Sequence, residues 1–266
     1  MTTPAATSIA VAGATGTVGR HVVAVLRARG HGVVELSRAR GVDLRRPAGA
    51  PIEDVAALLQ DCSAVIDCLN VATMARRESI AGFTSTTATL LAAGRAAEVP
   101  HHVALSIVGI DRAPTAYYAG KRAQERLVAE HGGAATILRA TQFHEFAGQM
   151  APALRRGPVL LAPRMRLAPV AASEVAEALV DLATGTPPSA VGGPRRLEMG
   201  GPVVHRFPDL VRRLGLPGWV VPIPYPGRGA RAVAGGALLP RSPWRTGQET
   251  FEEWLVRSTA PERSVV

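Results

Sequence analysis

The chain has 266 residues, 47% of them hydrophobic and 4% aromatic, and carries a net charge of +9. This apolar content suits a folded protein with a sizeable core and excludes a disordered chain. The charge comes from scattered arginines, and without aromatic clusters or a binding motif they do not indicate a nucleic-acid partner. No apolar stretch approaches the length of a membrane span, and no signal peptide is visible. We therefore expect a cytoplasmic protein with neither a nucleic-acid nor a membrane partner.

Apolar runs and helical patterns alternate through the first half of the chain. The runs predict strands at 8–14, 32–38, 41–44, 63–69, 102–110 and 135–141. Apolar residues at helical spacing predict helices between them, at 17–30, 51–60, 80–98 and 116–132. Strands that alternate with helices indicate right-handed crossovers and a parallel sheet. The expected fold class is α/β, with a Rossmann-type doubly wound parallel sheet.

Proline and glycine divide the chain into shorter segments after about residue 145. Three further helices are expected there, at 173–185, 207–215 and 246–256. Thr246 and Glu249 have the spacing of a capping box at the start of the last helix. We expect a Rossmann core at 1–145 and a smaller substrate-side lobe at 146–266. The two are expected to be interleaved, because helix 173–185 is predicted to pack back on the sheet.

The stretch GATGTVGR follows the first expected strand and opens the first expected helix. Gly13, Gly16 and Gly19 allow a tight turn, a close backbone approach to a pyrophosphate, and close packing of the helix on the strand. The helix N-terminus offers free N–H groups and a favourable dipole to the anion. The sequence therefore predicts dinucleotide binding. The expected contacts from this stretch are Gly13, Thr15, Gly16, Thr17, Val18 and Gly19.

The end of the second expected strand indicates which dinucleotide is bound. A site for NAD(H) has a carboxylate there, which holds the 2′-hydroxyl of the adenosine ribose. Here Ser37 and Arg38 stand at the tip, and Glu35 lies two residues inside the strand. A hydroxyl and a guanidinium suit a 2′-phosphate, so NADP(H) is preferred over NAD(H). The alternative is that Arg38 is one more solvated arginine of an arginine-rich chain.

Lys121 is the only lysine of the chain. Tyr117 stands four residues earlier, so both side chains would lie on one face of the expected helix, with Tyr118 turned away. A free tyrosine is a poor proton donor or acceptor at neutral pH because its pKa is about 10. A nearby ammonium lowers that pKa, and a slim lysine side chain can do this while it bonds a ribose hydroxyl. We therefore expect Tyr117 and Lys121 to be catalytic.

The glycine pattern, then Ser106 in a strand, then Tyr117-x-x-x-Lys121 in the next helix resemble the short-chain dehydrogenase/reductases. The spelling GATGTVG, the stretch RATQFHEF, and the segment PVAASEVAEALVDLATG followed by GGP are similar to the atypical NmrA-like branch of NAD(P)H-binding proteins. The resemblance covers nearly the whole chain and is looser beyond residue 200. It implies a Rossmann fold and, for members that keep the tyrosine and lysine, a reductase.

Further site residues are implied by the resemblance alone. Tyr117 would donate the proton, Lys121 would lower its pKa and bind the ribose, and Ser106 would hold the substrate oxygen. His144 would lie on the substrate side. The other implied contacts are to the cofactor: Asp43 near the adenine, Asn70 and Val71 at the ribose, and Thr141, Gln142 and Phe143 at the nicotinamide.

Two hypotheses about the function stay open. In the first, the protein is an NADPH-dependent oxidoreductase that reduces a carbonyl, conjugated alkene or quinone of a small, largely apolar substrate. In the second, it is an NADP(H)-binding redox sensor or regulatory protein without catalysis. Ser106 precedes Tyr117 by eleven residues, in a short loop with a proline that could misplace the serine. We expect no metal, since Cys62 and Cys68 are typical of buried thiols, and either a monomer or a homodimer.

Overall fold

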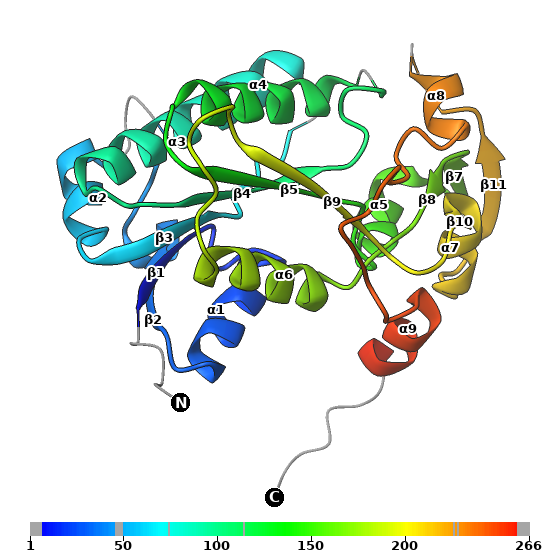
Figure 1. The fold of residues 1–266 in the computed structure, drawn as a ribbon. Coiled ribbons are helices and arrows are strands. Elements are labelled where there is room, and N and C mark those ends of the chain that lie inside the picture. Colours follow the sequence, from blue (N-terminus) through cyan, green and yellow to red (C-terminus); the bar gives the residue numbers. More distant parts are fainter. Residues whose placement is uncertain are drawn as a thin grey trace, which may run out of the picture.

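The computed structural model describes residues 7–45, 50–73, 75–113, 115–225, 227 and 229–259. Within these residues a central sheet carries helices on both faces, and a smaller lobe with two short sheets lies at one end (Figure 1). The strands of the central sheet follow the order β12-β9-β5-β4-β3-β1-β2, and all their pairings are parallel. The α/β fold with a Rossmann-type parallel sheet is thereby confirmed.

The inner strands of the central sheet are short apolar runs covered on both faces. The strands are β1 (Ser8–Ala12), β2 (Gly32–Leu36), β3 (Cys62–Asp67), β4 (His102–Ile107), β5 (Ala135–Ala140), β9 (Arg195–Gly200) and β12 (Arg245–Thr246). β1 lies between β2 and β3, with Ala12 level with Leu36 and Asp67, so the strand order reverses at β1. Doubly wound proteins bind their ligands in the crevice outside the carboxyl ends of the strands at such a reversal.

Helices cover both faces of this sheet. α2 (Ile52–Leu58), α3 (Arg76–Ala96) and α4 (Ala116–Glu130) lie on one face, and α1 (Gly19–Ala28) and α6 (Ala172–Thr184) on the other (Figure 1). The apolar stripe of α1, with Val22 and Leu26, shares a core with Val175 and Leu179 of α6. Both helices begin near the carboxyl edge of the sheet, so their N-termini border the same crevice. None of the described helices is long and apolar enough to cross a membrane.

The smaller lobe is built from short elements that follow β5. They are α5 (Phe146–Leu154), β6 (Arg155–Arg156), β7 (Val159–Pro163), β8 (Arg166–Leu167), β10 (His205–Arg206), α7 (Phe207–Arg213), β11 (Trp219–Ile223), α8 (Ala230–Ala234) and α9 (Phe251–Thr259). Its sheets have the orders β11-β7-β6 and β10-β8. A separate apolar core, with Leu160, Phe207, Val211 and Phe251, holds these elements together. β9 and β12 return from this half of the chain into the central sheet.

The strand predicted at 41–44 does not form. After β2, residues Arg38–Arg40 make a 3-10 turn, and Gly41 adopts a φ of +79°. This left-handed conformation ends the extended backbone, and the described residues up to Arg45 have no regular structure. The next strand beside β1 is therefore β3.

The capping box predicted for the last helix is wrong by four residues. Thr246 pairs with Gly200 as part of β12, so it cannot start a helix. Thr250 and Glu253 have the same spacing and cap α9 instead: the Glu253 amide donates to Thr250 Oγ1 (3.2 Å), and the Thr250 amide donates to Glu253 Oε2 (2.8 Å). The sequence TGQETFEE contains two such pairs. Because Thr246 pairs with Gly200 in the sheet, only the second pair can cap the helix.

Candidate active site

The glycine loop between β1 and α1 is fixed by close backbone contacts. Gly13 has a φ of +77°, and its amide donates to the Leu36 carbonyl of β2 (3.0 Å). A Cβ on Gly13 would lie 2.9 Å from the Cys68 carbonyl oxygen, and a Cβ on Gly19 would lie 2.1 Å from the Gly13 carbonyl oxygen. A side chain at either position would collide with backbone atoms. The loop therefore brings the start of α1 against the carboxyl ends of β1 and β3.

The N-terminus of α1 has the chemistry to bind an anion. Val18 precedes the helix without a side-chain hydrogen bond that caps it, and no acidic residue stands in the first turn. The first amides of a helix lack partners within the helix and carry the positive end of its dipole. A pyrophosphate at this point would accept hydrogen bonds from these amides. The loop and the helix start therefore fit the phosphate end of a dinucleotide.

The end of β2 carries the groups expected at the adenosine end of a dinucleotide. Ser37 is 7% exposed, and its Oγ has no hydrogen-bond partner among the described residues. Arg38 is exposed beside it. The Glu35 carboxylate is paired with Arg27 (2.6 Å) and Arg40 (3.4 Å). A buried hydroxyl without a partner thus lies at the position where a cofactor ribose is expected.

Asp43 and Val71 contact neighbouring side chains at the same edge of the sheet. Asp43 forms an ion pair with Arg45 (2.5 Å), and the hydrogen bonds from Arg45 lower the pKa of Asp43 to about 2. Val71 packs on α3, because a Cβ added to Gly82 would lie 2.8 Å from Val71 Cγ1. Both residues belong to the loops that follow β2 and β3, which border the crevice.

Tyr117 reaches the loop after β3 from the first turn of α4. Thr115 caps the helix, with its Oγ1 accepting from the Tyr118 amide (3.3 Å). The Tyr117 hydroxyl donates to Asn70 Oδ1 (2.6 Å), and its ring packs edge-on against Phe83 with centroids 5.8 Å apart. Burial raises the pKa of Tyr117 to about 12. The phenol is therefore protonated at neutral pH and held close to the glycine loop.

Lys121 lies one turn further along α4 and is 4% exposed. Its ammonium donates to the Leu105 carbonyl (2.8 Å), to Gln124 Oε1 (2.9 Å) and to the Leu69 carbonyl (3.4 Å). Desolvation by burial lowers the pKa of Lys121 to about 8. We expected this ammonium to lower the pKa of Tyr117, and the structure corrects that expectation: burial raises the phenol pKa, and the ammonium bonds other oxygens.

The structure does not bring Ser106 together with Tyr117. Ser106 is buried, and its Oγ donates to Glu125 Oε1 (2.6 Å). Arg139 donates two hydrogen bonds to the same carboxylate (2.8 and 2.6 Å). A buried carboxylate is a strong acceptor, so it holds the serine hydroxyl on the α4 side of β4. The expected contact of Ser106 with a substrate oxygen stays a prediction, and it would require the hydroxyl to leave Glu125.

The residues after β5 lie where the two lobes meet. Thr141 Oγ1 donates to the Ala168 carbonyl (2.5 Å), and Phe143 forms an isolated parallel bridge to the segment before α6. Gln142 Nε2 donates to the Tyr118 hydroxyl (3.3 Å). Gln142 Oε1 is buried and has no partner among the described residues. The structure thus places Gln142 next to Tyr118 of α4, and its amide oxygen is free to accept a hydrogen bond from a ligand.

His144 holds the last helix and is only 1% exposed. Its Nε2 donates to the Glu249 carbonyl (3.1 Å), and its ring contacts the rings of Phe251 and Trp254, with centroids 5.9 and 5.7 Å away. Burial lowers the pKa of His144. The place of His144 on the substrate side stays a prediction, and in this structure the ring packs against α9.

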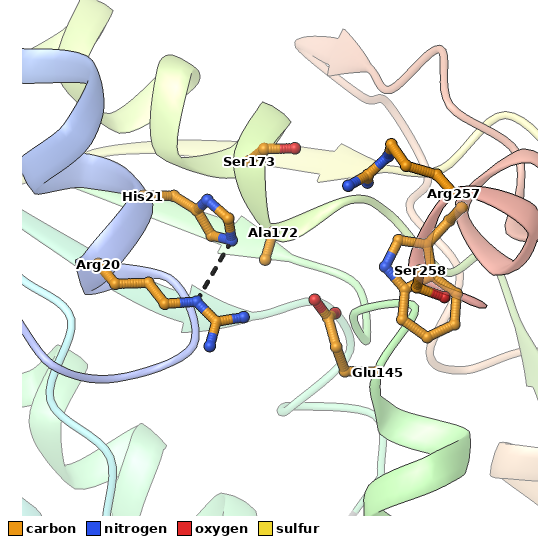
Figure 2. Close-up of a pocket in the computed structure, with 8 residues that line it drawn as sticks. Arg20, His21, Glu145, Ala172, Ser173, Arg257 and Ser258 are labelled. Atoms are coloured by element: carbon orange, nitrogen blue, oxygen red, sulfur yellow. Dashed lines mark hydrogen bonds between the residues drawn. The ribbon is translucent and has the colours of Figure 1, made fainter. Parts of the chain in front are cut away.

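A cavity of about 300 Å³ lies between the first turns of α1 and α6 and the end of α9 (Figure 2). Its lining residues are Arg20, His21, Glu145, Ala172, Ser173, Trp254, Arg257 and Ser258. Glu145 Oε2 is buried without a partner among the described residues. Sequence patterns did not reveal this group, because four separate parts of the chain contribute to it. The one local signal was that Arg20 directly follows the glycine loop.

Comparisons with solved structures found proteins of the same fold. An NADPH-dependent quinone oxidoreductase of Escherichia coli, solved with NADPH, is 16% identical over 94% of this chain and 99% of that chain, with a TM-score of 0.66. A nucleoside-diphosphate-sugar epimerase of Pseudomonas aeruginosa is 19% identical over 95% of this chain and 96% of that chain, with a TM-score of 0.68. An NAD-dependent NDP-hexosamine 5,6-dehydratase is 18% identical over 94% of this chain and 95% of that chain, with a TM-score of 0.69.

These solved structures share the fold of the chain. No curated protein sequence matches it. A family model described as NAD(P)H-binding matches residues 13–185, which is more than half of the chain and runs from the glycine loop to the end of α6. The chain therefore belongs to the NAD(P)H-binding family, as the sequence predicted.

Proposed function

We propose that the protein is an NADPH-dependent oxidoreductase that reduces a carbonyl, a quinone or a conjugated alkene of a small, largely apolar substrate. The observation that carries the proposal is the position of the Tyr117 hydroxyl, which Asn70 holds at the loop after β3, one turn of α4 from Lys121. Bound NADPH would supply the hydride. The phenol would supply the proton, so that a carbonyl carbon gains the hydride while its oxygen gains the proton.

The preference for NADPH is supported by the end of β2. The Glu35 carboxylate lies two residues inside the strand and is already paired with Arg27 and Arg40. The Ser37 hydroxyl lacks a partner, and Arg38 is exposed next to it. A hydroxyl donor and a guanidinium together suit a 2′-phosphate. We therefore assign Ser37 and Arg38 to that phosphate.

Lys121 is proposed to bind a ribose hydroxyl of the cofactor. Of its three hydrogen bonds, the one to the Leu69 carbonyl is the longest at 3.4 Å. Leu69 adjoins Asn70, which accepts a hydrogen bond from the Tyr117 hydroxyl. The weakest hydrogen bond of the Lys121 ammonium is therefore the one made on the side of the phenol. The other proposed cofactor contacts are the glycine-loop residues, Asp43, Asn70, Val71, Thr141, Gln142 and Phe143.

The surroundings of Tyr117 support an apolar, flat substrate. Its ring contacts Phe83 and Tyr118, with centroids 5.8 and 5.9 Å away. Tyr118 and Tyr225 lie at the edge of the apolar core of the smaller lobe. Aromatic walls of this kind favour offset or edge-on packing with another ring. A quinone or an aryl carbonyl would suit this place.

Tyr117→Phe tests the proton donor. The variant keeps the ring packing and loses only the hydroxyl, so we expect NADPH affinity to be unchanged and kcat to fall by about 100-fold or more. Tyr118→Phe is the matched control, since it removes the neighbouring hydroxyl, and its kcat should stay within about threefold of the original. Rates are measured with NADPH and a panel of quinones, aryl carbonyls and enones. Full turnover by Tyr117→Phe would refute the catalytic role.

A redox sensor without catalysis is the second candidate. The observation that favours it is the separation of the expected catalytic groups: Ser106 bonds Glu125, and the Lys121 ammonium is engaged by backbone and amide oxygens. A sensor would bind NADPH without reducing any member of the panel. It would also bind a partner protein with an affinity that differs between NADPH and NADP+.

A further inference from the structure

A row of buried polar side chains runs beneath the crevice. Gln124 of α4 accepts from Lys121 with Oε1 (2.9 Å) and donates from Nε2 to Asp67 Oδ2 (2.9 Å). Asp67 is the last residue of β3 and is 0% exposed, and Gln124 is 1% exposed. One amide therefore joins the single lysine of the chain to a buried carboxylate.

The order of donors and acceptors gives the amide one orientation. An ionised carboxylate only accepts hydrogen bonds, and an ammonium only donates them. Gln124 must therefore turn its NH2 group to Asp67 and its oxygen to Lys121, since the reverse would place like groups face to face. Asp67 is itself held by the Leu69 amide (3.0 Å) and by Thr87 Oγ1 (3.4 Å). The carboxylate cannot swing away without leaving these buried donors unpaired.

Lys121 is faced by groups from several elements. They are Asp67 of β3, Cys68 directly after it, Glu125 of α4, and the ring of Phe83 of α3, whose centroid is 4.6 Å from Nζ. His102 of β4 lies behind Asp67, 4.0 Å from the carboxylate, and burial lowers the pKa of His102 to about 4, so it is neutral. Burial also raises the pKa of Cys68, so its thiol is neutral. The charge of Glu125 is shared with Arg139. Asp67 is thus the carboxylate of this group that no arginine neutralises.

We propose that Asp67 and Gln124 are positioning residues for Lys121, with the carboxylate acting through the amide to keep the buried ammonium charged and aimed at the rim of the crevice. The inference rests on the proposed function in one respect: the role of Lys121, which is to donate a hydrogen bond to a ribose hydroxyl. Burial alone favours the neutral amine, and an opposite charge favours the ammonium. Without the charge of Asp67, the Lys121 ammonium bonds only neutral acceptors. The nearby Glu125 carboxylate cannot replace that charge, because it is already paired with the Arg139 cation.

The single lysine makes a direct test possible. Protein grown with lysine carrying carbon-13 at Cε gives one lysine signal, whose chemical shift follows the protonation of Lys121. The ligand-free protein is titrated from about pH 6 to about pH 11, which spans the shifted and the ordinary lysine pKa. We expect a midpoint near 8 for the original chain.

Two variants and a control decide the outcome. Asp67→Asn keeps the size of the side chain and removes the charge, so the midpoint should fall by about 1 pH unit. Gln124→Leu breaks the row while filling the same space, and should lower the midpoint in the same direction; Gln124→Met is used if the leucine variant does not fold. Asp181→Asn removes a carboxylate of α6 that pairs with Arg29 and Arg245, and should leave the midpoint unchanged.

NADPH titrations of the same proteins complete the test. The pH at which NADPH affinity begins to weaken should move down with the lysine midpoint in Asp67→Asn and Gln124→Leu. Variants that lose thermal stability while the lysine midpoint stays in place would show a merely structural role and overturn the proposal. The lysine titration needs no turnover, so a protein that fails to reduce any substrate refutes the proposed function and leaves this test intact.

Discussion

The two ends of the crevice are built in different ways. At the proposed phosphate end, backbone atoms form the site: a Cβ on Gly19 would lie 2.1 Å from the Gly13 carbonyl oxygen, and a Cβ on Gly13 would lie 2.9 Å from the Cys68 carbonyl oxygen. At the proposed reacting end, side chains form the site, and each has a partner of its own, such as Asn70 for Tyr117 and Glu125 for Ser106. A site made of backbone is complete as soon as the chain folds. A site made of side chains depends on which partners the ligand displaces.

Gly19→Ala should have the largest effect on NADPH affinity and stability, because it disrupts the end of the crevice that is formed by backbone atoms. A methyl group 2.1 Å from the Gly13 carbonyl oxygen forces the loop and α1 apart. We expect NADPH binding to weaken by about 100-fold or more and the free energy of unfolding to fall by about 3 kcal/mol. Both are measured by fluorescence titration and urea unfolding. Gly94→Ala, in open space within α3, is the control and should be neutral or slightly stabilising. Normal NADPH binding by Gly19→Ala would break the contrast between the two ends.

Arg38→Ala should have an intermediate effect and sharpens the contrast at the adenosine end. Loss of one charged hydrogen-bonding group from a phosphate site raises the Kd for NADPH by about tenfold, while the Kd for NADH should not change. Arg40→Ala removes the same charge from the same turn, but Arg40 faces Glu35, so NADPH affinity should change less. An equal loss in both variants would point to general attraction by positive charge.

Ser106→Ala should have the smallest effect, and its effect should be on stability. The hydroxyl donates to a buried carboxylate that keeps both bonds from Arg139, so we expect the free energy of unfolding to fall by about 1 kcal/mol. The kcat and KM of any reduction should stay within about twofold. A large fall in kcat with an unchanged free energy of unfolding would contradict this expectation. It would mean that Ser106 leaves Glu125 and contacts the substrate when the substrate binds.

The sequence predicted the parts of this site that are decided locally. Gly19 is required by the Gly13 carbonyl of its own loop, and the spacing of Tyr117 and Lys121 follows from the helix alone. The partner of Ser106 was out of reach, because Glu125 and Arg139 come from α4 and β5 and meet only in the folded protein. The raised pKa of Tyr117 has the same origin, since burial depends on what packs around the ring.

The strands β9 and β12 were missed for a related reason. β9 has the sequence RRLEMG, which lacks the apolar run of an inner strand, and β12 is two residues long. Their place is set by neighbours: β9 aligns Arg195 to Met199 with Thr136 to Ala140 of β5. The fold class did not depend on them, because the alternation of strands and helices in the first half already determines it.

The position of β9 has a consequence for how the chain folds. The segment that matches the family ends at residue 185, yet β5 finds its outer partner only at 195–200. During synthesis, and in any fragment cut after α6, β5 therefore stands as a bare sheet edge with its N–H and C=O groups unpaired. Such an edge readily pairs with another chain. We expect the fragment 1–185 to aggregate and the full chain to stay dispersed, so the stretch that matches the family model is shorter than the stretch that completes the pairing of β5.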